Sequence, residues 1–195
     1  MGESVKVKKL KVAWGITGAG DKIAEIVEVM KDLKKQSEDK VEIDVYISKA
    51  ADTMLKFYRL DGEIKKNFPK VMVEINANSP FLAAWMQSGK YEFLLIAPCS
   101  SNSVAKIVNS ISDTMLTNAA LMALKAFQHV WILPTDYRES VVSTLLPNGK
   151  EMKLRVRKEE ADQVRKLEAT EDVTVFANPQ KMKEHFLEWL KTIKN

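Results

Sequence analysis

Cysteine and histidine are scarce in this sequence, which limits the chemistry that its side chains can perform. Cys99 is the only cysteine, so one chain can form neither an internal disulfide nor a four-cysteine zinc or iron–sulfur site. His129 and His185 are the only histidines, which leaves few imidazole ligands for a metal ion. We therefore predict that the protein holds no metal.

Long apolar runs and a strong charge imbalance are missing as well. No apolar run approaches the length that crosses a bilayer, and residues 1–9 lack the apolar core of a signal peptide, so we expect a cytoplasmic protein without membrane contact. The net charge of +4 is small, and no long basic run is interleaved with aromatic residues, which argues against nucleic acid. Without a repeat or a linker, the 195 residues favour a single α/β domain over residues 1–195.

Short apolar strands alternate with helical patterns along the chain, which is typical of an α/β sheet. A helix with apolar residues at helical spacing begins at Ile23, and Asn178-Pro179 signals the start of the last helix. Ser79 as N-cap and Pro80 at the first helical position predict a helix from Phe81. Strands are expected at 11–14, 41–47, 71–75, 93–96, 130–133 and 173–176, and further helices at 50–60, 114–125 and 159–167.

Residues 142–157 depart from this alternation. Apolar and polar residues alternate on both sides of Pro147–Lys150, and the Asn148-Gly149 pair accepts the positive φ of a tight turn. We therefore predict a β-hairpin inserted near 142–157, which serves either as a flap or as an oligomer arm.

The segment Ala97–Ile107 joins a buried strand to a helix and carries an unusual run of polar side chains. Ser100, Ser101, Asn102 and Ser103 are four consecutive residues with hydroxyl or amide groups. At the start of a helix, such groups and the free backbone N–H groups suit an anion. The same residues are good N-caps, so a capped helix without a ligand is the alternative.

A glycine-rich turn, Gly15–Gly20, follows the first strand and lets backbone N–H groups approach a ligand closely. It is neither a Walker loop nor the strict dinucleotide fingerprint, and a tight turn without a ligand is the alternative. Ser48 stands where a dinucleotide-binding fold would place an acid, which favours a mononucleotide phosphate over NAD. We expect the strand exits at Gly15, Ser48, Pro98 and Pro134 to converge on one crevice.

Three further side chains leave more than one interpretation open. Phe81 and Trp85 lie four residues apart on one helix face, where they cover a flat ligand, enter a subunit interface or pack in the core. Asp113 precedes the helix expected at 114–125 and is either its N-cap or a contact residue.

Several of these segments together carry a family resemblance. The chain resembles the superfamily of flavin-containing cysteine decarboxylases, whose members hold FMN with a P-A-S-A-N-T-x-A-K-I type segment. The matching residues are Gly15-Ile16-Thr17-Gly18, Pro98-Cys99-Ser100-Ser101-Asn102-Ser103-Val104-Ala105-Lys106-Ile107 and Ser112-Asp113. Within that superfamily, Trp14–Gly20, Asn78–Leu82 and Leu133–Asp136 look most like the archaeoflavoprotein branch, which has FMN-dependent dihydromethanopterin reductases as close cousins.

This resemblance implies a doubly wound, mostly parallel, flavodoxin-like Rossmann sheet in three layers. It also implies one FMN per subunit and a homo-oligomer with the flavin near a subunit interface. Lys106 is expected to support its helix, and Cys99, at a position where the family usually has alanine, to be a small buried residue. The resemblance assigns the phosphate and ribityl contacts to Gly15, Ile16, Thr17, Gly18, Ser48, Ser100, Ser101, Asn102 and Ser103, and places Thr135 near the flavin ring.

The decarboxylating members use a histidine as acid–base group and a P-x-M-N motif, whereas the strand exit here reads Pro134-Thr135-Asp136-Tyr137. We assign no residue a catalytic role. We interpret the protein as an FMN-binding redox flavoprotein that accepts electrons from a ferredoxin-like donor and passes them on. Lys153, Arg155, Arg157 and Lys158 would attract that acidic partner. The alternatives are an FMN-dependent dihydromethanopterin reductase, a flavin-dependent decarboxylase or prenyltransferase relative, and a sheet protein without a cofactor.

Overall fold

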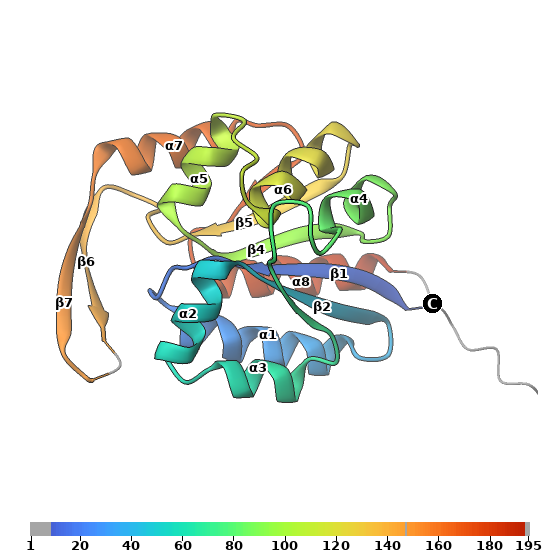
Figure 1. Ribbon diagram of the computed structural model, residues 1–195, viewed down its shortest axis with the longest axis horizontal. Coiled ribbons are helices and arrows are strands. Elements are labelled where there is room, and N and C mark those ends of the chain that lie inside the picture. Colours follow the sequence, from blue (N-terminus) through green and yellow to red (C-terminus); the bar gives the residue numbers. More distant parts are fainter. Residues whose placement is uncertain (1–8, 147, 194–195) are drawn as a thin grey trace, which may run out of the picture.

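The computed structural model describes residues 9–146 and 148–193, and a six-stranded parallel sheet lies at the centre of this part of the chain (Figure 1). The strands follow the order β3-β2-β1-β4-β5-β8. This is the Rossmann order and not the flavodoxin order, and the expected doubly wound sheet is confirmed. The strands are β1 (Leu10–Ile16), β2 (Val41–Ile47), β3 (Val71–Val73), β4 (Phe93–Cys99), β5 (His129–Pro134) and β8 (Val173–Val175).

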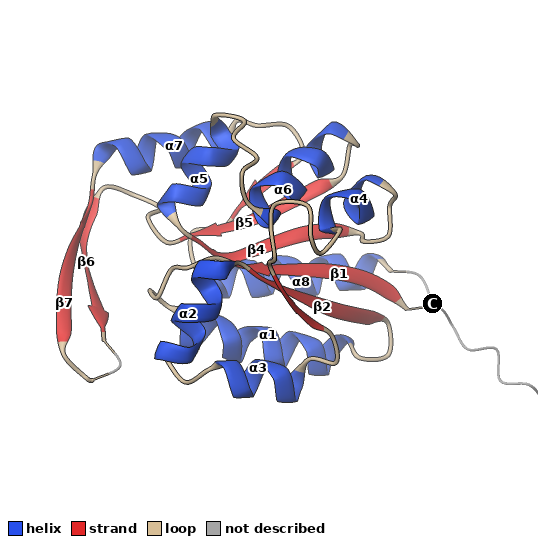
Figure 2. Ribbon diagram, in the orientation of Figure 1, coloured by secondary structure: helices blue, strands red, loops and turns tan. Residues whose placement is uncertain are grey.

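Helices cover both faces of the sheet and complete the predicted three layers (Figure 2). On one face lie α1 (Ile23–Ser37), α2 (Lys49–Phe57), α3 (Asp61–Asn67) and α8 (Pro179–Thr192). On the other lie α4 (Leu82–Gln87), α5 (Ser101–Val108), α6 (Met115–Lys125) and α7 (Lys158–Glu168). No helix in the described part combines the length and the apolar composition that a membrane span requires.

The apolar core is divided by the sheet into two halves, one on each face. Trp14 of β1 packs edge-on against Phe68 on the α1 side, where Met30 is also buried. Leu94 of β4 and Ala119 of α6 are buried on the opposite side. Because both faces are covered, the central strands are apolar almost throughout, as buried parallel strands are.

The strand expected at 71–75 ends at Val73, the strand expected at 93–96 extends to Cys99, and two helices differ from their predictions as well. The helix expected at 50–60 ends at Phe57, and the separate α3 follows it; only Ile64 of α3 is fully buried, so the sequence showed no apolar stripe. The helix expected from Phe81 begins at Leu82 with Phe81 at the N-cap position, so Ser79 is not its N-cap and Pro80 is not its first residue; Ser79 instead forms a β-bridge with Asn76. Asn178 does cap α8, with its side chain accepting from the Lys181 N–H.

The predicted β-hairpin is confirmed and stands apart from the rest of the molecule, at the left of Figure 1. It consists of β6 (Ser140–Leu145) and β7 (Glu151–Val156), and Gly149 in its turn has a φ of 79°. Pro147 of the expected turn and residues 1–8 lie outside the described residues. The hairpin follows β5, so it extends from the end of the sheet where the strands terminate.

Gly18 provides a test of how closely the first turn packs on α2. A Cβ atom at Gly18 would lie 2.6 Å from the Ala50 Cβ, whereas one at Gly62 in α3 would have nothing within 4 Å. We expect Gly18→Ala to lower the free energy of unfolding by about 1–3 kcal/mol through overpacking. Gly62→Ala should leave it unchanged or raise it by up to about 1 kcal/mol, because alanine loses less backbone entropy. Urea unfolding of both variants measures the difference, and equal effects of the two substitutions would contradict the close packing.

Candidate functional site

A cavity of about 600 Å³ opens at the carboxyl end of the sheet, where β1, β2, β3 and β4 terminate. It includes the point between β1 and β4 at which the strand order reverses, the usual ligand position in open α/β sheets. Its walls come from the turns after these strands and from the first turns of α2, α5 and α6. The lining residues are Thr17, Gly18, Ser48, Lys49, Ala50, Glu74, Asn76, Ala77, Ser100, Asn102, Ser103, Asp113, Thr114 and Leu116.

Three helix N-termini therefore meet at this cavity. The N-cap residues are Ser48 for α2, Ser100 for α5 and Thr114 for α6. Each cap oxygen accepts one backbone N–H from its own helix, at 3.1 Å from Ala51 and at 3.3 Å in the other two helices. A helix start leaves several N–H groups without an intrahelical acceptor, so the remaining ones are available to an anion.

Thr17 joins the turn after β1 to the turn after β4. Its hydroxyl donates to the Pro98 carbonyl oxygen at 2.8 Å and accepts the Ser100 N–H at 2.8 Å. Its own N–H also donates to the Pro98 carbonyl oxygen, at 3.2 Å. Because Thr17 is buried, these bonds hold the two turns together at the point where the strand order reverses.

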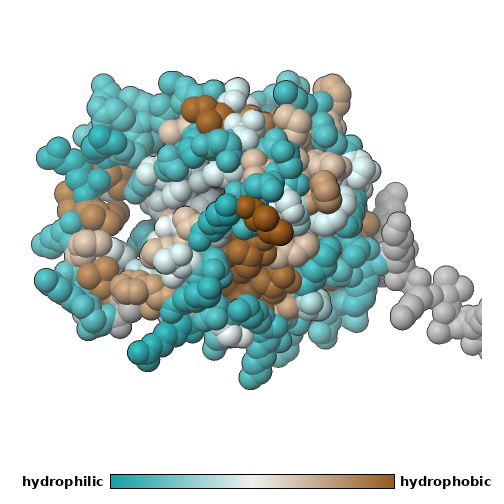
Figure 3. All heavy atoms as spheres, in the orientation of Figure 1, coloured by the Kyte–Doolittle hydropathy of each residue, from teal (hydrophilic) through white to brown (hydrophobic). Residues whose placement is uncertain are grey.

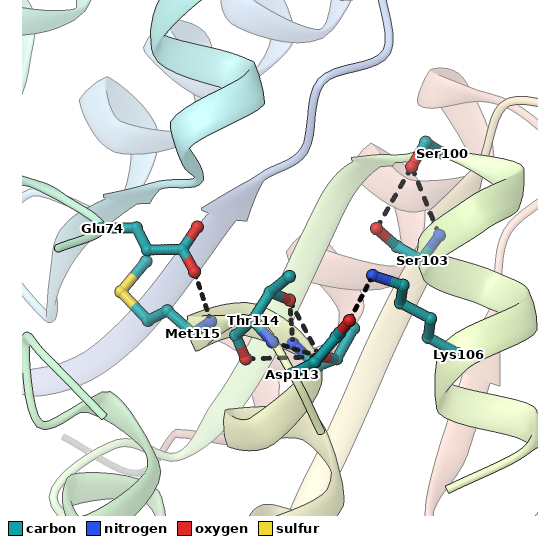
Figure 4. A network of polar contacts seen from close by, with 8 residues as sticks. Glu74, Ser100, Ser103, Lys106, Asp113, Thr114 and Met115 are labelled. Carbon is teal, nitrogen blue, oxygen red and sulfur yellow. Dashed lines mark hydrogen bonds and ion pairs between the residues drawn. The ribbon is translucent and has the colours of Figure 1, made fainter. Parts of the chain in front are cut away.

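Glu74, directly after β3, is a buried acid that binds two of the helix starts at once. One carboxylate oxygen accepts the Lys49 N–H of α2 at 3.0 Å, and the other accepts the Met115 N–H of α6 at 2.8 Å. Figure 4 shows the second of these contacts. Glu74 thus ties together two helices that cover opposite faces of the sheet.

The rim of the cavity carries an ion pair between α5 and the start of α6 (Figure 4). Lys106 Nζ lies 2.8 Å from an Asp113 carboxylate oxygen, and Asp113 is largely exposed. Thr114, and not Asp113, caps α6, so Asp113 is a contact residue. The charged residues that line the cavity are Lys49, Glu74 and Asp113.

Six of the ten residues predicted to bind a cofactor line the cavity: Thr17, Gly18, Ser48, Ser100, Asn102 and Ser103. The other four do not. Gly15 and Ile16 are buried in β1, where a Cβ at Gly15 would lie 2.7 Å from Leu116 Cδ2. Ser101 lines a separate groove of about 330 Å³ between α5 and α7.

Thr135 and Asp136 lie just after β5, outside the cavity lining. The Thr135 N–H donates to the Cys99 carbonyl oxygen at 3.0 Å, which places Thr135 beside the end of β4. Partial burial raises the pKa of the neighbouring Asp136 carboxyl, and a hydrogen bond from the Ser101 side chain opposes this rise. Of the four strand exits predicted to converge, those of β1, β2 and β4 line the cavity. The exit of β5 does not line it, and the exit of β3 lines it instead.

Sequence reasoning missed Lys49, Glu74, Asn76 and Thr114 among the polar lining residues. Asn76 follows the strand expected at 71–75, so the rule applied to the other strand exits could have found it, whereas Glu74 lies inside that expected strand and follows β3 only because β3 ends at Val73. Nothing in the sequence pairs Glu74 with Lys49 and Met115, because that contact depends on the arrangement of the two helices.

The cysteine and the two histidines do not line the cavity. Cys99 is fully buried, as predicted, and burial raises the pKa of its thiol, which stays protonated at neutral pH. His129 begins β5 at the opposite end of the sheet, and His185 packs on Trp131 with ring centroids 4.6 Å apart. The cavity lining therefore offers anion-binding and hydroxyl groups without a thiol or an imidazole.

The chain is similar to known flavoproteins over nearly its whole length. A protein of Methanocaldococcus jannaschii without an assigned function is 39% identical over 95% of this chain and 98% of its own. The dihydromethanopterin reductase (acceptor) of the same organism is 30% identical over 91% of this chain and 96% of its own. The structure of Burkholderia xenovorans DmrB in complex with FMN, described as a cubic protein cage for redox transfer, matches with a TM-score of 0.80 and 29% identity. That match covers 95% of this chain and 98% of DmrB.

The profile of the Flavoprotein family matches residues 2–189, which include every residue that lines the cavity. By this match, and by the residues that meet at the end of its sheet, the chain belongs to the flavoprotein family.

Proposed function

We propose that the protein is a redox flavoprotein that binds FMN in the cavity at the carboxyl end of the sheet. The observation that carries this proposal is the meeting of three helix N-termini and the Thr17–Gly18 turn around one cavity of about 600 Å³. Backbone N–H groups and hydroxyls suit a phosphate ester and a polyhydroxyl chain, which are the two polar parts of FMN. Bound FMN would supply the redox chemistry, and the protein would position it and tune its potential.

The residues present fit this cofactor. The hydroxyl of Ser48 and the side chain of Asn102 line the cavity and can donate hydrogen bonds to phosphate or ribityl oxygens. Lys49 adds a positive charge at the same wall. DmrB, which carries FMN in its crystal structure, supports the proposal through its similarity over 95% of this chain. Contacts of Gly15, Ile16 and Ser101 with the cofactor stay predictions, because none of these residues lines the cavity, and Thr135 remains our prediction for the flavin ring.

Substitutions at the cavity test the assignment of FMN. We expect Ser48→Ala and Asn102→Ala each to weaken FMN binding by about 1–3 kcal/mol, because each removes a hydrogen bond to a charged or strongly polar group. Asn109→Ala is the matched control, since Asn109 lies at the other end of α5 and bonds the Ala105 carbonyl oxygen. Titration of the apoprotein with FMN, followed by flavin fluorescence, measures the change. Full FMN affinity in both cavity variants would show that the cofactor lies elsewhere.

We propose an acidic ferredoxin as the electron donor, docked on the basic residues of the hairpin. Lys153 and Arg155 are exposed on one face of β7, opposite Ser143 and Val141 of β6. Lys158 follows at the start of α7, whereas Arg157 forms an ion pair with Glu160, which reduces its part in docking. The hairpin extends from the end of the sheet that holds the cavity, so a protein bound there approaches the same end of the molecule (Figure 1).

Charge reversal on the hairpin tests this docking. We expect replacement of Lys153, Arg155 and Lys158 by glutamate to slow flavin reduction by reduced ferredoxin at least about tenfold at low ionic strength. The difference should shrink at high salt, where exposed charges are screened. Reversal of the exposed Lys66 and Lys125, which lie on α3 and α6, is the control. Stopped-flow absorbance gives the rates, and equal rates at low salt would contradict the proposal.

A second candidate function is reduction of a dihydropterin, and the M. jannaschii dihydromethanopterin reductase supports it with 30% identity over 91% of this chain. Chemically reduced protein mixed with a dihydropterin under anaerobic conditions separates the two functions. Reoxidation of the flavin together with formation of tetrahydropterin would identify a reductase. A flavin that stays reduced until an electron-accepting protein is added would identify a carrier. A decarboxylase is less well supported, since neither histidine lies at the cavity.

We further propose that the protein forms a homo-oligomer with the flavin near a subunit interface. Figure 3 shows a hydrophobic patch near the middle of its face, over β3 and the segment after it. The large exposed apolar side chains there are Val73, Ile75 and Phe81, with exposed fractions of 38%, 66% and 65%. Glu74 and Asn76, which alternate with the first two, line the cavity, so the patch borders it. The cubic cage described for DmrB supports such an assembly.

A further inference from the structure

Glu74 places a negative charge inside a cavity whose other features favour anions. Its side chain is buried, and both carboxylate oxygens accept a backbone N–H. The two N–H groups belong to Lys49 and Met115, the first residues of α2 and α6. A carboxylate meets this geometry because it offers two acceptor oxygens, whereas the amide of glutamine offers one.

This contact changes how much negative charge the cavity accepts. Anions bind at helix N-termini because N–H groups and the helix dipole attract them. At α2 and α6 that attraction already acts on the Glu74 carboxylate. In the described part of the chain no carboxylate accepts a backbone N–H from the first turn of α5, where the Ser103 N–H donates to Ser100 and only the Ser101 side chain contacts the Asp136 carboxyl. A ligand with one phosphoryl group can use that third helix start, whereas a second phosphoryl group would bring additional negative charge into the cavity that Glu74 lines.

We propose that Glu74 is a specificity-determining residue that makes the cavity select a phosphomonoester over a pyrophosphate. The inference rests on the proposed FMN site. It adds a physical reason why that site takes a mononucleotide, which has one phosphoryl group, and rejects a dinucleotide, which has two linked phosphoryl groups. Repulsion between Glu74 and the additional negative charge lowers the affinity for the pyrophosphate class. Lys49 reduces this repulsion without cancelling it, because its side chain is exposed to solvent and its charge is screened more than that of the buried Glu74.

Small inorganic anions test this selection without the bulk of a dinucleotide. Inorganic phosphate and inorganic pyrophosphate compete with FMN for the wild-type protein and for two variants, and flavin fluorescence gives the inhibition constant of each anion. Glu74→Gln removes the charge and keeps one acceptor oxygen, and Glu74→Asp keeps the charge on a shorter side chain. We expect Glu74→Gln to improve competition by pyrophosphate relative to phosphate by about tenfold. A tenfold change corresponds to the Coulomb energy between two unit charges roughly 12 Å apart at an effective dielectric constant of about 20.

The ratio of the two inhibition constants separates selection from support of the fold. A purely structural role would weaken FMN binding in both variants and leave the ratio unchanged, which would overturn the proposal. A ratio that changes equally in Glu74→Asp and Glu74→Gln would overturn it too, because the charge is retained in the first. Glu74→Met is a second neutral variant; if neither neutral variant folds while Glu74→Asp does, the role of Glu74 is structural and the proposal fails. Wild-type protein that binds no FMN would instead contradict the proposed function.

Discussion

The unpaired N–H groups at the starts of helices are the constraint on which this site depends. A parallel sheet directs the carboxyl ends of its strands to one end of the domain, and the following helices begin there. In this protein Ser48, Ser100 and Thr114 each satisfy one such N–H, and Glu74 satisfies two more. The remaining groups line a cavity of about 600 Å³. The requirement to pair backbone donors and the capacity to bind an anion therefore have the same origin.

The walls of the cavity are held by backbone contacts more than by long side chains. Thr17 bonds the turn after β4 through its hydroxyl and its N–H, which closes the gap between β1 and β4. Gly18 lies so close to Ala50 that a side chain at Gly18 would displace the turn. Bonds of this kind hold the donors in place before a ligand arrives, so little ordering entropy is lost on binding.

The two ends of the sheet differ in chemical character. The carboxyl end holds the cavity and continues into the basic hairpin, so a cofactor and a docked partner can meet there (Figure 1). Near the amino ends of β4 and β5 an aromatic cluster packs, with Phe93 and Trp131 stacked at a centroid distance of 3.8 Å. Phe186 and Trp189 of α8 contact Phe93 edge-on. These aromatic contacts thus lie away from the end of the sheet at which the cavity opens.

The sequence alone determined the alternation of strands and helices, the hairpin, and the polar run at Ser100–Ser103, because periodicity, turn residues and N-caps are local signals. It also placed Thr17, Gly18 and Ser48 at strand exits that the structure brings to one cavity. Only the tertiary structure decided that Ser101 turns toward α7, that the exit of β3 replaces that of β5, and that Glu74 reaches two helices. The reason is physical: these contacts join residues far apart in the chain, 41 positions for Glu74 and Met115, and the order in which strands pair and helices pack sets them.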